Sequence, residues 1–226
     1  MKTTAPAKTT KKRILLVDDH PVMRDGFAQL INHEADLHVC AEAATPTEAL
    51  ELLSQHKLHL AIVDLSLGDA SGLTLVRDLL HRQRDLPVLV LSMHDESLYA
   101  ERVLRAGARG FVMKQASTEE VLSAIRTVLS GVNYVSDRIK GRMLQAMVTG
   151  QKSAEGLDTL SDREMEVFQL IGKGRSTREI AEGLSLSIKT IETYRMHLKE
   201  KLDARTATEL GRRAVEWTSR QQTGKF

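Results

Sequence analysis

Short apolar runs rich in β-branched residues alternate with longer mixed segments through the first 130 residues of the chain. Each run has the length and composition of a strand buried on both faces. The segments between them have helical apolar spacing, and some open with a helix start signal such as Thr45 followed by Glu48. This alternation predicts an α/β fold with a doubly wound, parallel, five-stranded sheet. The five runs are Ile14–Val17, Leu37–Cys40, Leu58–Val63, Val88–Leu91 and Gly110–Met113.

The pattern changes to helices alone in the last third of the chain. The capping pairs Ser161–Glu164 and Ser176–Glu179 predict the starts of two short helices, and Ser187 predicts the start of a third. Apolar residues recur at helical spacing after each start and once more near the C-terminus. This part of the sequence predicts a small all-α domain.

Composition sets the expected boundaries between these parts. Residues 1–12 are mostly Lys, Thr and Ala, which predicts a disordered tail. Residues 131–157 carry four glycines among polar residues and predict a linker of mixed order. The α/β domain is therefore expected over residues 13–130 and the all-α domain over residues 158–226.

The overall composition is that of a folded, cytoplasmic protein. Apolar residues make up 42% of the chain and charged residues 27%, and Cys40 is the one cysteine. The N-terminus lacks the apolar run of a secretory signal, and no apolar run is long enough to cross a bilayer. We therefore expect a reducing compartment and no membrane partner.

Charge is divided unevenly between the two parts. Residues 1–134 have a formal balance of −2, and residues 135–226 have a balance of +4. The second part is the place to look for a polyanion partner, although an excess of this size is common on soluble proteins.

Charged and hydroxyl side chains stand at the ends of the predicted strands. Ligand sites in open α/β sheets lie at the carboxyl ends of the strands. Three carboxylates gathered there repel one another unless a cation lies between them, and oxygen ligands favour Mg²⁺. A hydroxyl and an ammonium group beside them could hold a phosphoryl group. The residues at these strand ends are Asp18, Asp19, Asp64, Ser92 and Lys114.

Four segments of the first part, in this order and spacing, resemble the receiver domain of two-component response regulators. They read ILLVDDHPVMR, IVDLSLGDASGL, VLSMHD and ARGFVMK. The resemblance implies that Asp64 is the phosphoacceptor and that Asp18, Asp19, Asp64 and the carbonyl of Ser66 hold Mg²⁺. It also implies switch roles for Ser92 and Phe111 and a phosphate-binding role for Lys114. The chain departs from the family at Gly68, where many members have proline, and at Phe111, where tyrosine is also common.

Residues 160–202 resemble the LuxR-type helix-turn-helix of the NarL/FixJ class of transcription regulators. The predicted helix from Ser187 would lie in the major groove of DNA, with its early positions deepest. Glu192 could accept a hydrogen bond from a cytosine amino group, and a solvated role is its alternative. The candidate DNA contacts are Ser187, Lys189, Thr190, Thr193, Arg195, His197 and Lys199.

These observations favour a response regulator that is a transcription regulator and not an enzyme. We expect a sensor histidine kinase or a small phosphodonor to modify Asp64, after which the protein forms a homodimer on promoter DNA. RNA polymerase is a further candidate partner. Two alternatives stay open at this point. One is a phosphorylation-independent DNA-binding protein that uses its receiver as a dimerisation scaffold. The other is an aspartate-nucleophile phosphatase, which is weakened because Ser66 stands where a second, acid/base aspartate would be needed.

Overall fold

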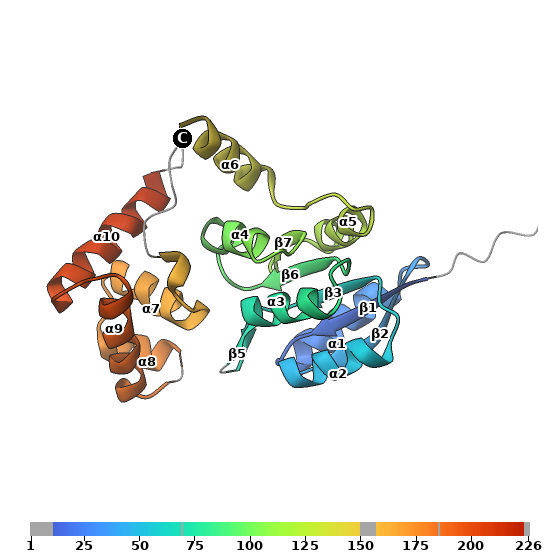
Figure 1. Cartoon of the computed structure of the whole chain (residues 1–226), viewed down its shortest axis with the longest axis horizontal. Helices are drawn as coiled ribbons and strands as arrows, with labels where there is room; N and C mark the ends of the chain where they lie inside the picture. The colour runs from blue at the N-terminus through green and yellow to red at the C-terminus, as the bar shows by residue number, and fades with distance from the viewer. Residues whose placement is uncertain (1–10, 69, 150–156, 185, 224–226) are drawn as a thin grey trace, which may run out of the picture. The chain divides into compact units, whose positions relative to one another are not determined.

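The computed structural model describes residues 11–68, 70–149, 157–184 and 186–223 and divides the chain into two compact units, Met1–Met143 and Leu144–Phe226 (Figure 1). The first unit is α/β and the second is all-α, as the hydrophobic patterns predict. No helix in the described residues is both long and apolar enough to cross a membrane.

The first unit is built on a five-stranded parallel sheet. The strands are β1 (Lys12–Val17), β2 (Leu37–Ala43), β3 (Leu60–Val63), β6 (Val88–Ser92) and β7 (Gly110–Met113), in the order β2-β1-β3-β6-β7. Strand β3 is the middle strand in this order and is buried at every position, so its carboxyl end lies in the middle of the sheet edge. The prediction of a five-stranded parallel sheet is confirmed.

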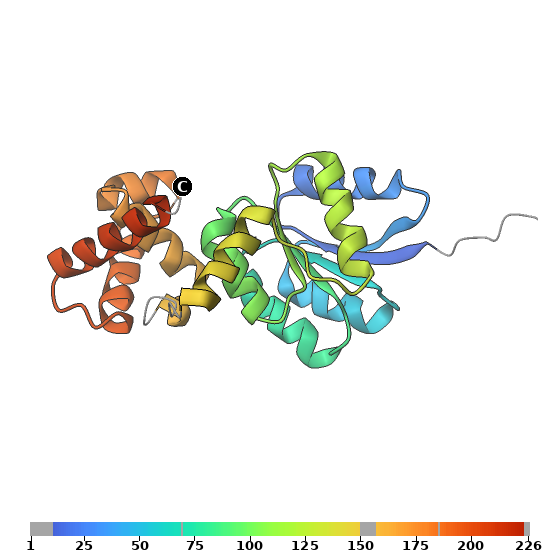
Figure 2. The same ribbon diagram turned by 90° about the horizontal axis from the view of Figure 1, so that it is seen from above.

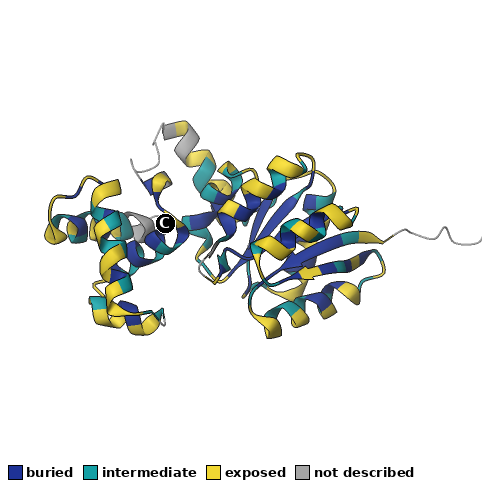
Figure 3. Ribbon diagram, turned by 60° about the horizontal axis from the view of Figure 1, so that its bottom comes forward, coloured by how far each residue is buried: buried dark blue, intermediate teal, exposed yellow. Residues whose placement is uncertain are grey.

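Helices cover both faces of this sheet (Figure 2). Helices α1 (Pro21–Asn32) and α5 (Thr118–Leu129) cover one face and pack with it into a single apolar cluster. Helices α2 (Pro46–Gln55), α3 (Gly72–Arg82) and α4 (Glu96–Arg105) cover the other. Colouring by exposure shows buried strands between helices that are exposed on their outer sides (Figure 3). This burial supplies the main driving force for the fold.

Start signals in the sequence mark real helix starts. The side chains of Thr45 and Ser117 accept hydrogen bonds from the backbone N–H of Glu48 and Glu120. The Ser117 cap is one-sided, because the Glu120 carboxylate instead accepts a hydrogen bond of 3.3 Å from the hydroxyl of Tyr134.

The structure adds a feature that the sequence pattern did not predict. Strands β4 (Ser66–Leu67) and β5 (Ala70–Ser71) form a two-residue antiparallel hairpin directly after β3. Gly68 stands at its turn with a φ of +59°. Strands this short show no alternation of polar and apolar residues, and the segment reads as a loop.

The expected disordered segment does not extend to residue 12, because Lys12 is the first residue of β1 and the Lys11 Nζ donates to the Glu34 carbonyl. Residues 1–10 lie outside the described residues. At the other end of the unit, Tyr134 forms a parallel bridge with Gly110 at the outer side of β7.

Helix α6 (Asp137–Thr149) follows, in the segment expected to be a linker. Its Ile139 is buried, and the Arg142 guanidinium donates to the Ser97 carbonyl of α4. The N-terminal part of α6 therefore packs on the first unit. Residues 150–156 of the expected linker lie outside the described residues.

The second unit contains a short 3₁₀ helix, η1 (Leu157–Thr159), and helices α7 (Asp162–Gly172), α8 (Thr177–Gly183), α9 (Ile188–Lys201) and α10 (Ala207–Thr223). Ser161 and Ser176 form complete capping boxes with Glu164 and Glu179. Helices α7 and α10 cross closely at Gly172, where a Cβ atom would lie 2.5 Å from the Ala214 carbonyl oxygen. The core residues shared by the four helices include Phe168, Ile180, Ile191, Leu198 and Leu210.

Candidate functional site

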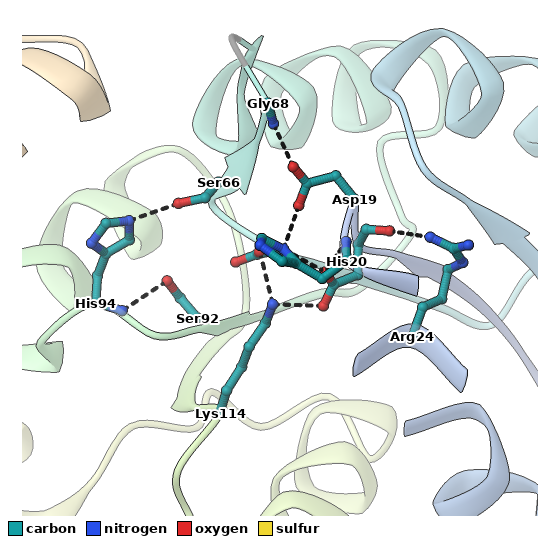
Figure 4. Close-up of polar contacts among 10 residues, drawn as sticks. Asp19, His20, Arg24, Ser66, Gly68, Ser92, His94 and Lys114 are labelled. Atoms are coloured by element: carbon teal, nitrogen blue, oxygen red, sulfur yellow. Dashed lines mark hydrogen bonds and ion pairs between the residues drawn. The ribbon is translucent and has the colours of Figure 1, made fainter. Parts of the chain in front are cut away.

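Three acidic residues and one lysine meet at the carboxyl end of the sheet (Figure 4). Asp18 and Asp19 follow β1, Asp64 follows β3, and Lys114 follows β7. The Lys114 Nζ lies 2.6 Å from Asp18 Oδ2 and 2.8 Å from Asp64 Oδ2, with all three side chains buried. The sheet therefore brings together residues that lie up to 96 positions apart in the sequence.

Negative charge exceeds positive charge in this pocket. Burial raises the pKa of Asp64, and the neighbouring Asp18 raises it further, against the opposing effect of Lys114. Burial alone would lower the pKa of Lys114, but the two carboxylates outweigh it and raise that pKa. The buried carboxylates of Asp18 and Asp64 thus share the single ammonium group of Lys114, and the Asp19 carboxylate lies close by. A further cation would relieve this repulsion.

The donor set fits a hard divalent cation. Ligand atoms of Asp18, Asp19, His20 and Asp64 all lie within 4.8 Å of one another. The Oδ1 atom of Asp64 is buried and has no hydrogen-bond partner among the described residues. The carboxylate oxygens suit Mg²⁺, whereas the exposed His20 ring lies on the rim, 2.7 Å from Asp19 Oδ1.

The two residues expected to act as a switch, Ser92 and Phe111, are both buried. Ser92 ends β6, and its hydroxyl accepts a hydrogen bond of 3.2 Å from the His94 backbone N–H. The Phe111 side chain is buried within β7. The structure thus places Ser92 and Lys114 at neighbouring strand ends, as the sequence predicts.

Two residues near the pocket make contacts that the sequence analysis did not predict. The first is His94, whose Nε2 lies 2.8 Å from the Ser66 hydroxyl and whose ring packs on Tyr99 with centroids 4.7 Å apart. Gly72 is the second, because a Cβ atom there would lie 2.2 Å from the Asp64 carbonyl oxygen. Only glycine lets α3 begin this close to the backbone of Asp64.

The predicted DNA-contacting residues lie on α9. Ser187 is its N-cap, and its hydroxyl accepts a hydrogen bond from the Thr190 backbone N–H. The Thr193 hydroxyl donates to the Lys189 carbonyl. Lys189 and Thr193 are exposed near the start of the helix, where a groove-binding helix makes its deepest contacts.

The later positions of α9 divide into two groups. Arg195 and Lys199 line an open pocket of about 270 Å³ with Glu192, Met196 and residues of α8 and α10. His197 faces the other way, with its Nδ1 3.6 Å from the buried Glu164 carboxylate. Lys201 donates to the same carboxylate at 2.6 Å. The His197 side chain is thus tied to the packing of α7 against α9.

Comparison with known proteins agrees with this division. Residues 14–126 match the response regulator receiver domain, and residues 158–214 match the bacterial regulatory proteins of the luxR family. The oxygen regulatory protein NreC of Staphylococcus carnosus is 36% identical over 88% of this chain and 94% of that protein. The chain belongs to the two-component response regulators of the NarL/FixJ class. As a response regulator of this class it combines a receiver with a DNA-binding LuxR-type domain.

Solved structures of other response regulators are similar to this one. A LuxR-family response regulator from Aurantimonas sp. SI85-9A1 has a TM-score of 0.57 and 32% identity, over 62% of this chain and 99% of that one. RcsB from Salmonella enterica serovar Typhimurium, solved bound to the promoter rprA with the phosphomimetic BeF3-, also has a TM-score of 0.57. Its identity is 26%, over 90% of this response regulator and 98% of RcsB.

Proposed function

We propose that this response regulator accepts a phosphoryl group on Asp64 and that the modified protein binds promoter DNA as a homodimer. The observation that carries the proposal is the buried Asp64 carboxylate, which has an unpartnered Oδ1 and lies against Asp18 and Lys114. A sensor histidine kinase is the expected donor. RNA polymerase is a proposed partner at the promoter.

Different residues of the pocket would have different roles in phosphoryl transfer. A carboxylate oxygen of Asp64 attacks the donor phosphorus, the new P–O bond forms, and the bond to the donor nitrogen breaks with its electron pair going to the leaving histidine. Asp18, Asp19, Asp64 and the Ser66 carbonyl would hold Mg²⁺, which neutralises charge on the transferred group when bound. Lys114 and Ser92 then hold the phosphoryl oxygens.

The exposed face of α9 is the proposed DNA contact. Its cationic residues would neutralise phosphates, and the short polar residues at its start would reach base edges. Two such helices in a dimer bind paired half-sites more tightly than one, because the second contact is intramolecular. RcsB, which is 26% identical, was solved bound to promoter DNA in the presence of the phosphomimetic BeF3-, and this supports the proposed link between the phosphoryl group and promoter binding.

Labelling with an acyl phosphate and Mg²⁺ tests the phosphoacceptor. We expect Asp64→Asn to abolish labelling while the protein stays folded, because it removes the nucleophile and keeps the shape. Asp78→Asn, an exposed carboxylate on α3, is the matched control and should be labelled like the parent. Equal labelling of Asp64→Asn and the parent would exclude this assignment.

A DNA-binding experiment separates the proposal from a phosphorylation-independent regulator. With Mg²⁺ and beryllofluoride, binding of the full chain to a paired half-site should tighten, and Asp64→Asn should not respond. Tight binding by the parent that ignores beryllofluoride would favour the receiver as a plain dimerisation scaffold.

A further inference from the structure

The turn of the β4–β5 hairpin contacts the metal-binding pocket directly. The Gly68 backbone N–H donates a hydrogen bond of 2.8 Å to Asp19 Oδ2 (Figure 4). Gly68 lies 49 positions from Asp19 in the sequence. The contact therefore depends on how the hairpin packs beside the loop between β1 and α1. Ser66, at the base of the same hairpin, contacts His94 on the other side of the pocket.

Position 68 favours glycine because of its backbone conformation and not because space is short. A Cβ atom at this position would meet nothing within 4 Å, so space does not exclude a side chain. Its φ of +59° is a left-handed conformation that glycine adopts freely and asparagine tolerates. Proline, which many receiver domains have at this position, fixes φ near −65° and has no N–H. A chain with proline there cannot form this hydrogen bond.

Asp19 depends on this bond more than the other two acids depend on any one contact. Asp18 and Asp64 are both held by Lys114, and Asp18 also accepts from the His20 backbone N–H. The Asp19 side chain is 26% exposed, and its contact with the His20 ring lacks hydrogen-bond geometry. Within the described residues, the Gly68 N–H is the one hydrogen-bond donor to this carboxylate.

We propose that Gly68 is a positioning residue for the metal site, whose N–H orients the Asp19 carboxylate for Mg²⁺. The inference rests on the proposed function, since it takes Asp19 as a metal ligand. A hydrogen bond to a carboxylate lowers the entropy lost when that side chain is fixed by a ligand, because the group is ordered beforehand. Without the bond, Mg²⁺ binding must itself order Asp19.

The first experiment tests the bond itself. Amide hydrogen exchange of Gly68 is measured by NMR in the full-length parent and in Asp19→Ala. We expect slow exchange at Gly68 in the parent and exchange at least tenfold faster in Asp19→Ala. Equal exchange rates at Gly68 would overturn the proposal without reference to metal or phosphate.

The second experiment compares Gly68→Pro with Gly68→Asn in the full chain. Mg²⁺ affinity is measured by titration calorimetry with MgCl₂ alone, and unfolding is measured by urea titration without Mg²⁺. We expect Gly68→Pro to bind Mg²⁺ about tenfold more weakly, from the size of a charge-assisted hydrogen bond. Gly68→Asn keeps the N–H and tolerates the backbone conformation, so it should stay within about twofold of the parent.

A metal-positioning role and a merely structural role predict different results for the labelling rate. If Gly68 positions Asp19, saturating Mg²⁺ should restore the initial labelling rate of Gly68→Pro. A purely structural defect would lower the unfolding free energy and would not be rescued by metal. Parent-like Mg²⁺ affinity in Gly68→Pro, or an equal loss in Gly68→Asn, would refute the inference. A parent that neither binds Mg²⁺ nor accepts a phosphoryl group would refute the proposed function, and the metal role of Gly68 with it.

Discussion

Asp64 in the first unit and Glu164 in the second are both only 3% exposed, yet their pKa values move in opposite directions. Burial raises the pKa of Asp64, and the nearby Asp18 adds to this effect. Burial also acts to raise the pKa of Glu164, but Lys201 and the Ser161 hydrogen bonds outweigh it and lower that pKa. Two carboxylates with similar burial thus differ: the surroundings of Asp64 disfavour its charged form, and the surroundings of Glu164 favour its charged form.

The difference separates a carboxylate that suits the proposed phosphoryl transfer from a carboxylate that joins two helices. Glu164 completes the capping box of α7 and bonds Lys201 of α9, so its charge joins two helices. Asp64 shares Lys114 with Asp18 and retains an unpartnered oxygen. A site that is to bind a cation and react must leave part of its bonding capacity unused, at a cost in stability.

The largest expected effect comes from removing the shared cation. Lys114→Met should lower the unfolding free energy of the first unit by roughly 3 kcal/mol, because it leaves two buried carboxylates without a counter-charge. Addition of Mg²⁺ should recover part of this loss. Urea unfolding followed by circular dichroism measures it, with the exposed Lys57→Met as the control. An unchanged midpoint for Lys114→Met would contradict the charge imbalance.

Neutralising Glu164 should destabilise the second unit. We expect Glu164→Gln to cost roughly 2 kcal/mol near neutral pH, because it removes a charged partner of Lys201 in a buried cap. The fluorescence of Trp217, the only tryptophan, reports this unit because its ring packs 5.6 Å from that of Phe168. Since the folded-state pKa of Glu164 is lowered, its contribution is present above its ordinary value of 4.5 and is lost as pH falls through the folded value. A pH-independent difference between the variant and the parent would contradict this.

Neutralising Asp64 should change the unfolding free energy in the opposite direction and stabilise the first unit. Asp64→Asn should raise the stability of the first unit by roughly 1 kcal/mol at neutral pH in the absence of Mg²⁺, although it abolishes labelling. The folded-state pKa of Asp64 is raised, so the stability that this group contributes is lost as pH rises from its ordinary 3.8 toward the folded value. The gain should therefore vanish at acidic pH, and Asp78→Asn should show none. Destabilisation by Asp64→Asn would remove the contrast with Glu164.

The smallest expected effect is on DNA binding. Lys199→Ala should weaken binding about evenly across sequences and reduce the salt slope by roughly 1, if Lys199 contacts one phosphate. Thr193→Ala should instead change sequence preference. Fluorescence anisotropy at several salt concentrations measures both, with Lys57→Ala of the first unit as the control. An unchanged slope in Lys199→Ala would exclude the phosphate contact.

Sequence patterns predict those parts of the molecule whose signal is local. Buried strands such as β6 carry continuous apolar runs, here Val88–Leu91, and helix starts such as Ser176 have their capping partner within three residues. The acidic pocket is also predictable, since parallel strands end at the same edge and Asp64 closes a central strand.

Contacts between distant segments were not predictable in this way. The Ser66–His94 contact joins residues 28 positions apart, and the Lys201–Glu164 contact joins residues 37 apart. Neither contact produces a periodic pattern in the sequence, because the two residues of each pair come together only through the packing of loops and helices. The contact between Gly68 and Asp19 was not predictable for the same reason, although the absence of proline at position 68 is visible in the sequence.

The bridge between Tyr134 and Gly110 also covers part of one edge of the sheet. Strand β7 is the last strand of its sheet, and an open edge of this kind can add a strand from another chain. The backbone of Tyr134 donates to the Arg109 carbonyl and accepts from the Phe111 N–H, so these edge groups are already paired within the chain. Residues that follow the receiver thus shield its sheet from intermolecular strand addition.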